Sequence, residues 1–133
     1  MRRIPASVRS SCALPIATLL VLLRVGMAAH AAGDATRGAE AYEARCGGCH
    51  SVESDRVGPR HAGIVGRRAG SVAGFAYSPA LKASGFTWDP ARLERWLTDP
   101  ESLVPGQRMG YRVDDAAVRA DVIAYLATLK PGS

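Results

Sequence analysis

One short motif constrains this chain more than any other feature: two cysteines and a histidine stand within five residues, as Cys46-Gly47-Gly48-Cys49-His50. This C-x-x-C-H spacing is typical of covalent haem attachment. Residues at positions i, i+3 and i+4 share a helix face, so two thiols can reach the vinyl groups of a porphyrin edge while the imidazole reaches the iron. The motif therefore predicts a fold built around a haem.

Three other uses fit parts of the motif. A disulfide between Cys46 and Cys49 is sterically possible, but it leaves His50 unexplained. A thioredoxin-like redox pair should follow a strand in a βαβ pattern, whereas residues 33–45 are rich in alanine and glutamate. A structural zinc ion normally takes four ligands, and the motif together with His61 would be the whole supply. Haem attachment is favoured, and these three uses remain its alternatives.

Residues 1–31 have the layout of a secretory signal peptide. Three arginines precede a mostly apolar stretch at residues 11–23, and Ala29-His30-Ala31 supplies small residues at alternate positions. The apolar stretch is broken by Pro15 and followed by Arg24, so it falls short of the roughly 20 residues that a bilayer span needs. We expect export to the periplasm with the signal removed; a membrane anchor formed by an uncleaved signal is the alternative.

Cleavage after Ala31, or else after Ala32, changes the composition of what remains. Four of the 17 basic residues lie in the signal, which leaves 13 basic and 12 acidic residues in the domain at 32–133. Basic residues massed on one surface, as nucleic-acid binding requires, are therefore not expected. A domain of about 100 residues has a limited capacity to bury its own core, so a large cofactor would help to supply one. Met109 is the domain's only methionine.

The domain shows helical patterns separated by loops and no alternating strand pattern. Asp34 can cap a first helix at 35–45, and shorter helices are predicted at 78–83 and, after Asp89-Pro90, at 91–98. A last helix begins near Asp114 and ends before Pro131-Gly132, with apolar residues at helical spacing: Val118, Val122, Tyr125, Leu126 and Leu129. The pattern predicts an all-α architecture whose loops close over a cofactor.

Further segments, in matching order and spacing, resemble class I cytochrome c, meaning mitochondrial cytochrome c and its soluble bacterial relatives. They are Gly33-Asp34, Gly38, Tyr42, Gly58-Pro59, Gly66-Arg67-Arg68, Gly70, Gly74-Phe75-Ala76-Tyr77, Thr87-Trp88, Pro105-Gly106-Gln107-Arg108-Met109 and Ile123-Ala124-Tyr125-Leu126. The resemblance implies a small cytochrome c fold, with short helices and loops wrapped around one covalently bound haem. Its N- and C-terminal helices would cross, with Gly38 and Tyr42 near Val122 and Tyr125.

The resemblance also implies roles for individual residues. Cys46 and Cys49 would hold haem c covalently, and His50 and Met109 would be the two axial ligands of its iron. Ligation by histidine and methionine raises the reduction potential, so a positive potential is expected. The carbonyl of Pro59 would accept the other ring hydrogen of His50 and fix its tautomer.

Three further residues resemble those that donate hydrogen bonds around the haem propionates: Arg67, Tyr77 and Trp88. Such donors are needed because burying a propionate without a partner is costly. His61 lies on the His50 side of the haem and is expected to be a packing or surface histidine.

The chain departs from the family pattern at three positions. Leu81 stands where many relatives have an asparagine, and Gln107 replaces a common threonine beside the methionine ligand. Trp96 stands where a tyrosine often faces the methionine sulfur. Because tryptophan can only donate, Trp96 would either donate to this sulfur or exclude water from it.

The function that the resemblance implies is electron transfer. Two filled axial positions leave no place for a small-molecule substrate, so a monomeric carrier would exchange electrons with redox partner proteins that dock briefly at the haem edge. Arg45, Arg56 and Arg108 would flank that edge, while Glu101 stands where a lysine is common, which predicts weak salt dependence. The alternatives are a haem enzyme or gas- or peroxide-reactive protein with a labile methionine, and a dedicated electron-accepting subunit of a dehydrogenase.

Overall fold

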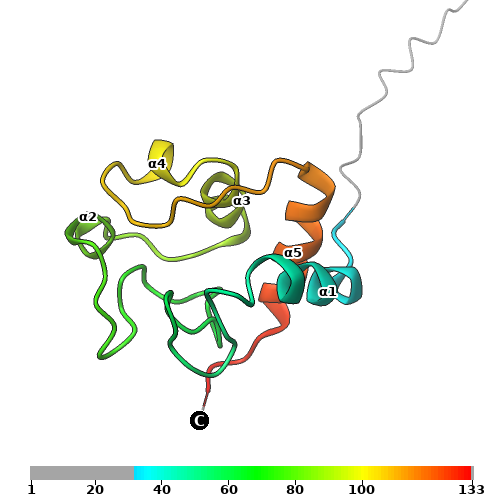
Figure 1. The fold of residues 1–133 in the computed structure, drawn as a ribbon, viewed down its shortest axis with the longest axis horizontal. Coiled ribbons are helices and arrows are strands. Elements are labelled where there is room, and N and C mark those ends of the chain that lie inside the picture. The colour runs from blue at the N-terminus through cyan, green and yellow to red at the C-terminus, as the bar shows by residue number, and fades with distance from the viewer. Residues whose placement is uncertain (1–31, 133) are drawn as a thin grey trace, which may run out of the picture.

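The computed structural model describes residues 32–132, so the expected signal at 1–31 and its cleavage site after Ala31 lie outside the described residues. These residues form five helices, and Figure 1 shows long loops between most of them. Their bounds are Ala35–Arg45 (α1), Pro79–Ala83 (α2), Pro90–Thr98 (α3), Pro100–Leu103 (α4) and Ala116–Thr128 (α5). Within residues 32–132 the sole β-type pairing is an isolated antiparallel bridge between Arg68 and Thr87. The predicted all-α fold class is confirmed.

Side-chain caps explain where the helices begin. The carboxylate of Asp34 accepts hydrogen bonds from the N–H groups of Thr36 and Arg37 at the start of α1, which satisfies donors that have no partner within the helix. The other caps are Ser78 for α2, Asp89 for α3, Asp99 for α4 and Asp115 for α5. Prolines at the first position of α2, α3 and α4 supply a suitable φ and lack the N–H that would be left over.

The first and last helices cross at a glycine. A Cβ on Gly38 would lie 1.9 Å from the carbonyl oxygen of Asp121 and 2.9 Å from Cβ of Tyr125, so no larger residue fits between the two backbones. One turn further along α1, the ring of Tyr42 packs at 5.3 Å from that of Tyr125. The predicted crossing of the N- and C-terminal helices is confirmed.

A carboxylate of α5 secures the start of α1. Asp121 accepts hydrogen bonds from the backbone N–H of Asp34 at 2.6 Å and from Nε and Nη2 of Arg37 at 2.8 and 2.9 Å. These hydrogen bonds, that from Arg37 first, lower the pKa of Asp121. Because Asp121 is only 9% exposed, its charge needs such partners. The two ends of the domain are therefore joined by both close packing and an ion pair.

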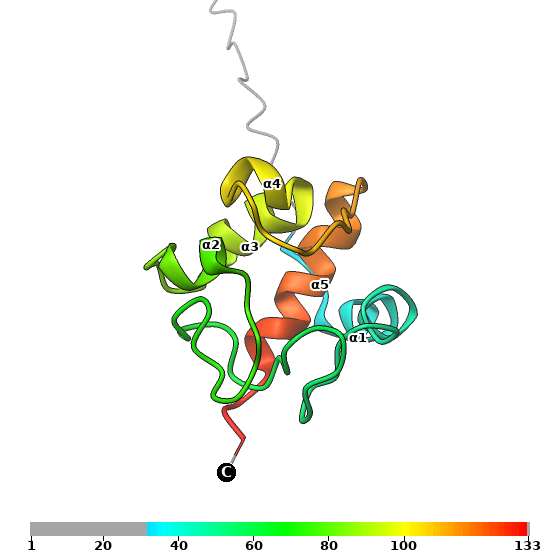
Figure 2. The same cartoon turned by 60° about the vertical axis from the view of Figure 1, so that its left-hand side comes forward.

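The remaining helices place the core beside α5. In Figure 2, α5 lies between α1 on one side and α2 and α3 on the other, and α3 packs against it. The most deeply buried side chains include Leu93 of α3, Val122 of α5 and Val113 of the loop before α5. No helix within residues 32–132 has the length and apolar character needed to cross a membrane.

Candidate haem site

A cavity of about 460 Å³ lies between α3, α5 and the loops that follow α1 and α4. This volume is in the range of cofactor pockets. All eight residues that the sequence assigns to the site line it: Cys46, Cys49, His50, Pro59, Arg67, Tyr77, Trp88 and Met109. Most of the remaining wall is apolar and includes Ile64, Phe75, Leu81, Leu97 and Leu126. The fold thus brings segments that are more than 60 residues apart in the sequence to a single apolar cavity.

The cysteine motif follows directly after α1. The helix ends at Arg45, and the motif turns on hydrogen bonds from the N–H groups of Cys49 and His50 to the carbonyl of Cys46, at 3.0 and 2.8 Å. Both thiols are free; that of Cys49 is exposed, whereas burial raises the pKa of Cys46 to about 11. Within residues 32–132 no group of three or more His, Cys, Asp or Glu side chains is arranged to hold a metal ion.

The imidazole of His50 is fixed through one of its nitrogens. Nδ1 lies 2.8 Å from the carbonyl oxygen of Pro59. Because a carbonyl can only accept, Nδ1 carries the hydrogen and Nε2 keeps the lone pair that a metal requires. Burial lowers the pKa of His50, although the bond to Pro59 opposes the effect. A Cβ on Gly58 would lie 2.1 Å from Cε1 of the ring, so the chain can pass His50 here only as glycine.

Met109 reaches the same cavity from the loop between α4 and α5. Nε1 of Trp96 donates a hydrogen bond to its Sδ at 3.3 Å. Of the two roles left open by the sequence, Trp96 thus takes that of a donor to the sulfur. In Figure 1 the yellow-to-orange segment between α4 and α5 lies in the upper part of the domain, and the green segment that follows α1 lies in the lower part.

Two polar residues hold the methionine loop in place. The backbone N–H of Met109 donates to Oε1 of Gln107, and Nε2 of Gln107 donates to Glu101 at 3.2 Å. Glu101 also accepts from the N–H of Gly106 at 2.9 Å. From the sequence, Gln107 and Glu101 are expected only to depart from the family pattern. The structure shows that together they tie down the loop.

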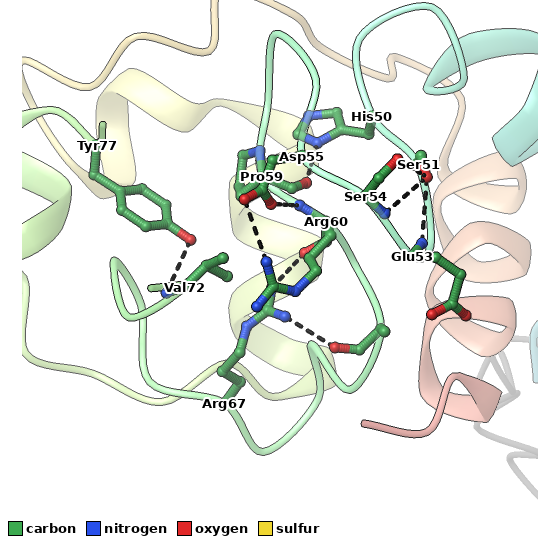
Figure 3. A network of polar contacts seen from close by, with 11 residues as sticks. His50, Ser51, Glu53, Ser54, Asp55, Pro59, Arg60, Arg67, Val72 and Tyr77 are labelled. Atoms are coloured by element: carbon green, nitrogen blue, oxygen red, sulfur yellow. Dashed lines mark hydrogen bonds and ion pairs between the residues drawn. The ribbon is translucent and has the colours of Figure 1, made fainter. Parts of the chain in front are cut away.

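The three expected propionate donors line one side of the cavity, and Figure 3 shows the network around two of them. Arg67 donates from Nη1 to the carbonyl of Ala62 at 2.9 Å and from Nη2 to that of Arg60 at 2.8 Å. The hydroxyl of Tyr77 accepts from the N–H of Val72 at 3.4 Å, so its own hydrogen is not used by that bond. Burial lowers the pKa of Arg67 and raises that of Tyr77.

Trp88 is placed by its backbone. Its N–H donates to the carbonyl of Arg67, and its carbonyl accepts from Gly66, both at 2.9 Å. Its indole packs edge to face against Trp96 at 5.3 Å and against Phe86 at 4.9 Å. The pairing brings Arg67 and Trp88 together beside the cavity. Leu81 completes this side without any polar group, where many relatives have an asparagine.

These residues fit a haem by the chemistry of their donors. An imidazole nitrogen with a lone pair and a thioether sulfur are the ligands that cytochromes c use for iron. Both occur in one mostly apolar cavity that is also lined by two free thiols and by side chains with N–H and O–H donors. Both thiols are free rather than joined in a disulfide, and residues 32–132 hold no group of three or more His, Cys, Asp or Glu side chains arranged for a metal ion.

Comparisons with known proteins agree with this site. Residues 35–130 match the family model described as Cytochrome c. Cytochrome c2 of Rhodomicrobium vannielii is 42% identical over 120 residues, which cover 87% of this chain and 95% of that protein. Cytochrome c-550 of Novispirillum itersonii is 41% identical over 112 residues, which cover 74% of this chain and 100% of that protein.

A solved structure shows the same fold. Cytochrome cH from Methylobacterium extorquens is 46% identical, superposes with a TM-score of 0.68, and covers 72% of this chain and 99% of its own. Sequence, fold and the chemistry of the cavity therefore agree. The chain belongs to the cytochrome c family: it binds haem c covalently and is an electron carrier rather than an enzyme.

Proposed function

We propose that the iron is held by Nε2 of His50 and Sδ of Met109, with the porphyrin joined to Cys46 and Cys49. The convergence of two independently fixed side chains on one cavity carries this proposal: Pro59 orients His50, and Trp96 donates to Met109. Bound haem supplies a one-electron couple between ferrous and ferric iron. The protein thus carries single electrons between redox partners.

The residues around the cavity each have a defined task in this scheme. The apolar wall excludes water, and the small movements allowed by two fixed ligands keep reorganisation low. Arg67, Tyr77 and Trp88 supply donors for the two propionates, whose charge would otherwise be buried at a high cost. Arg67 is suited to this task because its guanidinium, which stays charged even when partly buried, is already held by two backbone carbonyls.

Optical spectra of both oxidation states test the ligation. We expect a six-coordinate ferric form with the weak band near the red edge of the visible spectrum that arises from the bond between iron and methionine sulfur. Met109→Ala abolishes this band, whereas Arg108→Ala, an exposed neighbour in the same loop, retains it. A five-coordinate parent protein, or a band that survives in Met109→Ala, contradicts the assignment.

We propose that partners dock at the mouth of the cavity, where the porphyrin edge lies closest to the solvent. Arg45, Arg108, Val57 and Tyr111 line the cavity, and Val57 and Tyr111 are 80% and 42% exposed. Arg56 adds a third exposed cation beside Val57. This mixture of apolar and basic groups suits brief contacts with partner proteins.

We propose that the carrier is monomeric. Sedimentation at micromolar concentration tests this state of assembly, and a stable dimer contradicts the proposal.

We further propose that residues 1–31 are a secretory signal and that the mature domain, 32–133, works in the periplasm. The charged, apolar and small-residue regions of the signal support this. Mass spectrometry of the exported protein tests it. A mature chain that begins at Ala32 or Gly33 agrees with the proposal, whereas one that begins at Met1 points to an uncleaved membrane anchor.

A further inference from the structure

A second histidine lies against the proposed iron ligand. The ring of His61 stacks on that of His50, with the ring centroids 4.1 Å apart and the planes inclined by 21°. Nδ1 of His61 shares a hydrogen bond of 3.0 Å with the hydroxyl of Tyr42. The sequence predicted a packing or surface histidine here and gave no sign of this pair.

Tyr42 and His61 are both held in place by the backbone around the haem motif. Tyr42 is 3% exposed and belongs to α1, and its carbonyl accepts from the N–H of Cys46 at the start of the haem motif. The backbone N–H of His61 donates to the carbonyl of Ser51, the residue after His50, at 3.0 Å. The hydrogen bond between the two side chains thus links the helix before the motif to the loop behind it.

The stack supplies a restraint that the hydrogen bond to Pro59 does not. A single hydrogen bond from Nδ1 fixes one edge of the His50 ring and leaves the ring able to rock about that contact. A parallel ring on its face opposes this rocking. His61 is in turn prevented from rotating by the bond to Tyr42. The contacts from Tyr42 to His61 and from His61 to His50 therefore fix the plane of the His50 imidazole. The hydrogen bond to Pro59 fixes the direction in which its Nδ1 points.

The stack brings the two imidazoles face to face. The two planes are inclined by only 21°, so His61 presents the face of its ring, rather than an edge, to His50. Nδ1 of His61 is engaged by the hydroxyl of Tyr42, which keeps this face toward His50. Such a face attracts positive charge, and the imidazole of an axial ligand is more positive when the iron is ferric.

We propose that His61 is a positioning residue: held by Tyr42, it sets the plane of the His50 imidazole and stabilises the ferric form of the iron. The inference rests on the proposed function, since it requires His50 to be an axial ligand. Ligand plane and iron orbitals are coupled, so the orientation is visible in the ferric electron paramagnetic resonance spectrum and in the paramagnetic NMR shifts of the haem methyl groups.

Four variants test the proposal in the haem-loaded protein. His61→Leu removes both stack and hydrogen bond, and we expect a higher midpoint potential together with altered g values and methyl shifts. His61→Phe keeps a stacked ring, so its midpoint potential is expected to lie between those of His61→Leu and the parent protein. Tyr42→Phe removes only the hydroxyl, and we expect a smaller change of the same sign. In the double variant the Tyr42→Phe change adds nothing to that of His61→Leu, because Tyr42 acts through His61.

The outcomes separate this proposal from the ligation itself. Unchanged g values, methyl shifts and potential in His61→Leu overturn the positioning role, as does a fully additive double variant. In both cases the low-spin six-coordinate spectrum persists, so the proposed ligation stands. If His61→Leu does not fold, Tyr42→Phe decides alone, since it keeps the ring and its packing against Tyr125. A parent protein without a six-coordinate spectrum rejects the ligation instead.

Discussion

Trp96 stands where a tyrosine often faces the methionine sulfur in relatives. Its indole N–H donates to Sδ of Met109 at 3.3 Å, within a mostly apolar wall that includes Leu81. In the proposed ligation, a hydrogen bond to the sulfur withdraws electron density from the ligand, and this favours ferrous iron over ferric iron.

Trp96→Phe tests this role because it keeps an aromatic ring and removes the donor. We expect a lower midpoint potential by up to about 40 mV, the one-electron equivalent of a hydrogen bond worth about 1 kcal/mol. Protein-film voltammetry measures the shift, and the persistence of the red-edge band shows that Met109 is still bound. An unchanged or raised potential contradicts the account.

At the scale of elements, the crossing of α1 and α5 leaves the least freedom. Gly38→Ala places a methyl group against the backbone of α5, where a Cβ meets the oxygen of Asp121 at 1.9 Å. Overpacking against a backbone that cannot yield costs about 3 kcal/mol. We expect the free energy of unfolding to fall by that amount in guanidinium titrations.

Gly48→Ala is the matched control for this substitution. Gly48 has open space around its Cβ position and no positive φ, so the same exchange removes chain entropy from the unfolded state without a clash. The free energy of unfolding of Gly48→Ala is expected to stay unchanged or rise slightly. Equal losses in both variants would show that the crossing is not the cause.

The hydrogen bonds that Asp121 of α5 accepts at the start of α1 make the stability of this helix pair sensitive to acid. Hydrogen bonds from Arg37 and the N–H of Asp34 hold the pKa of Asp121 below its usual range. Its stabilisation is therefore complete above the unfolded-state pKa of about 3.9 and is lost as the pH falls through the lower folded-state pKa. We expect Asp121→Asn to lower Tm at pH 7 and this difference to shrink in acid. Asp114→Asn, at an exposed position, is the control.

The helices that could be predicted are those with local signals. Asp34 and the periodic apolar residues of the last helix gave α1 and α5, although α5 begins at Ala116, two residues after the expected start. The helix at Pro100–Leu103 was missed because four residues are too few to show a helical period.

The residues of the site, like the helices, were predictable where the sequence carries a signal and not where contacts depend on the tertiary fold. The cysteine motif is local and was visible at once, and Met109 followed from the family resemblance; the structure places both in one cavity. The links from Gln107 to Met109 and from Tyr42 to His61 were not foreseen. Each depends on where the tertiary fold brings a polar side chain, and no spacing in the sequence records that.

For the whole molecule, the near balance of charge matters most for encounters with partners. The domain has 13 basic and 12 acidic residues, and Glu101, which binds Gly106, adds negative charge beside the loop that also carries Arg108. Weak steering makes association less dependent on ionic strength. We expect electron transfer to an acidic partner to slow only slightly between low salt and about 0.15 M. Stopped-flow measurement of a steep decline would refute this expectation.

The placement of both tryptophans beside the cavity has an optical consequence. Trp88 and Trp96 are the only two in the chain, and both line the cavity with their rings 5.3 Å apart. A porphyrin in this cavity accepts their excitation energy, so the native protein emits almost no indole fluorescence. When the chain opens, the haem stays tethered at Cys46 and Cys49 while the indoles move away and become bright. The intensity of tryptophan fluorescence therefore reports unfolding of this protein without an added label.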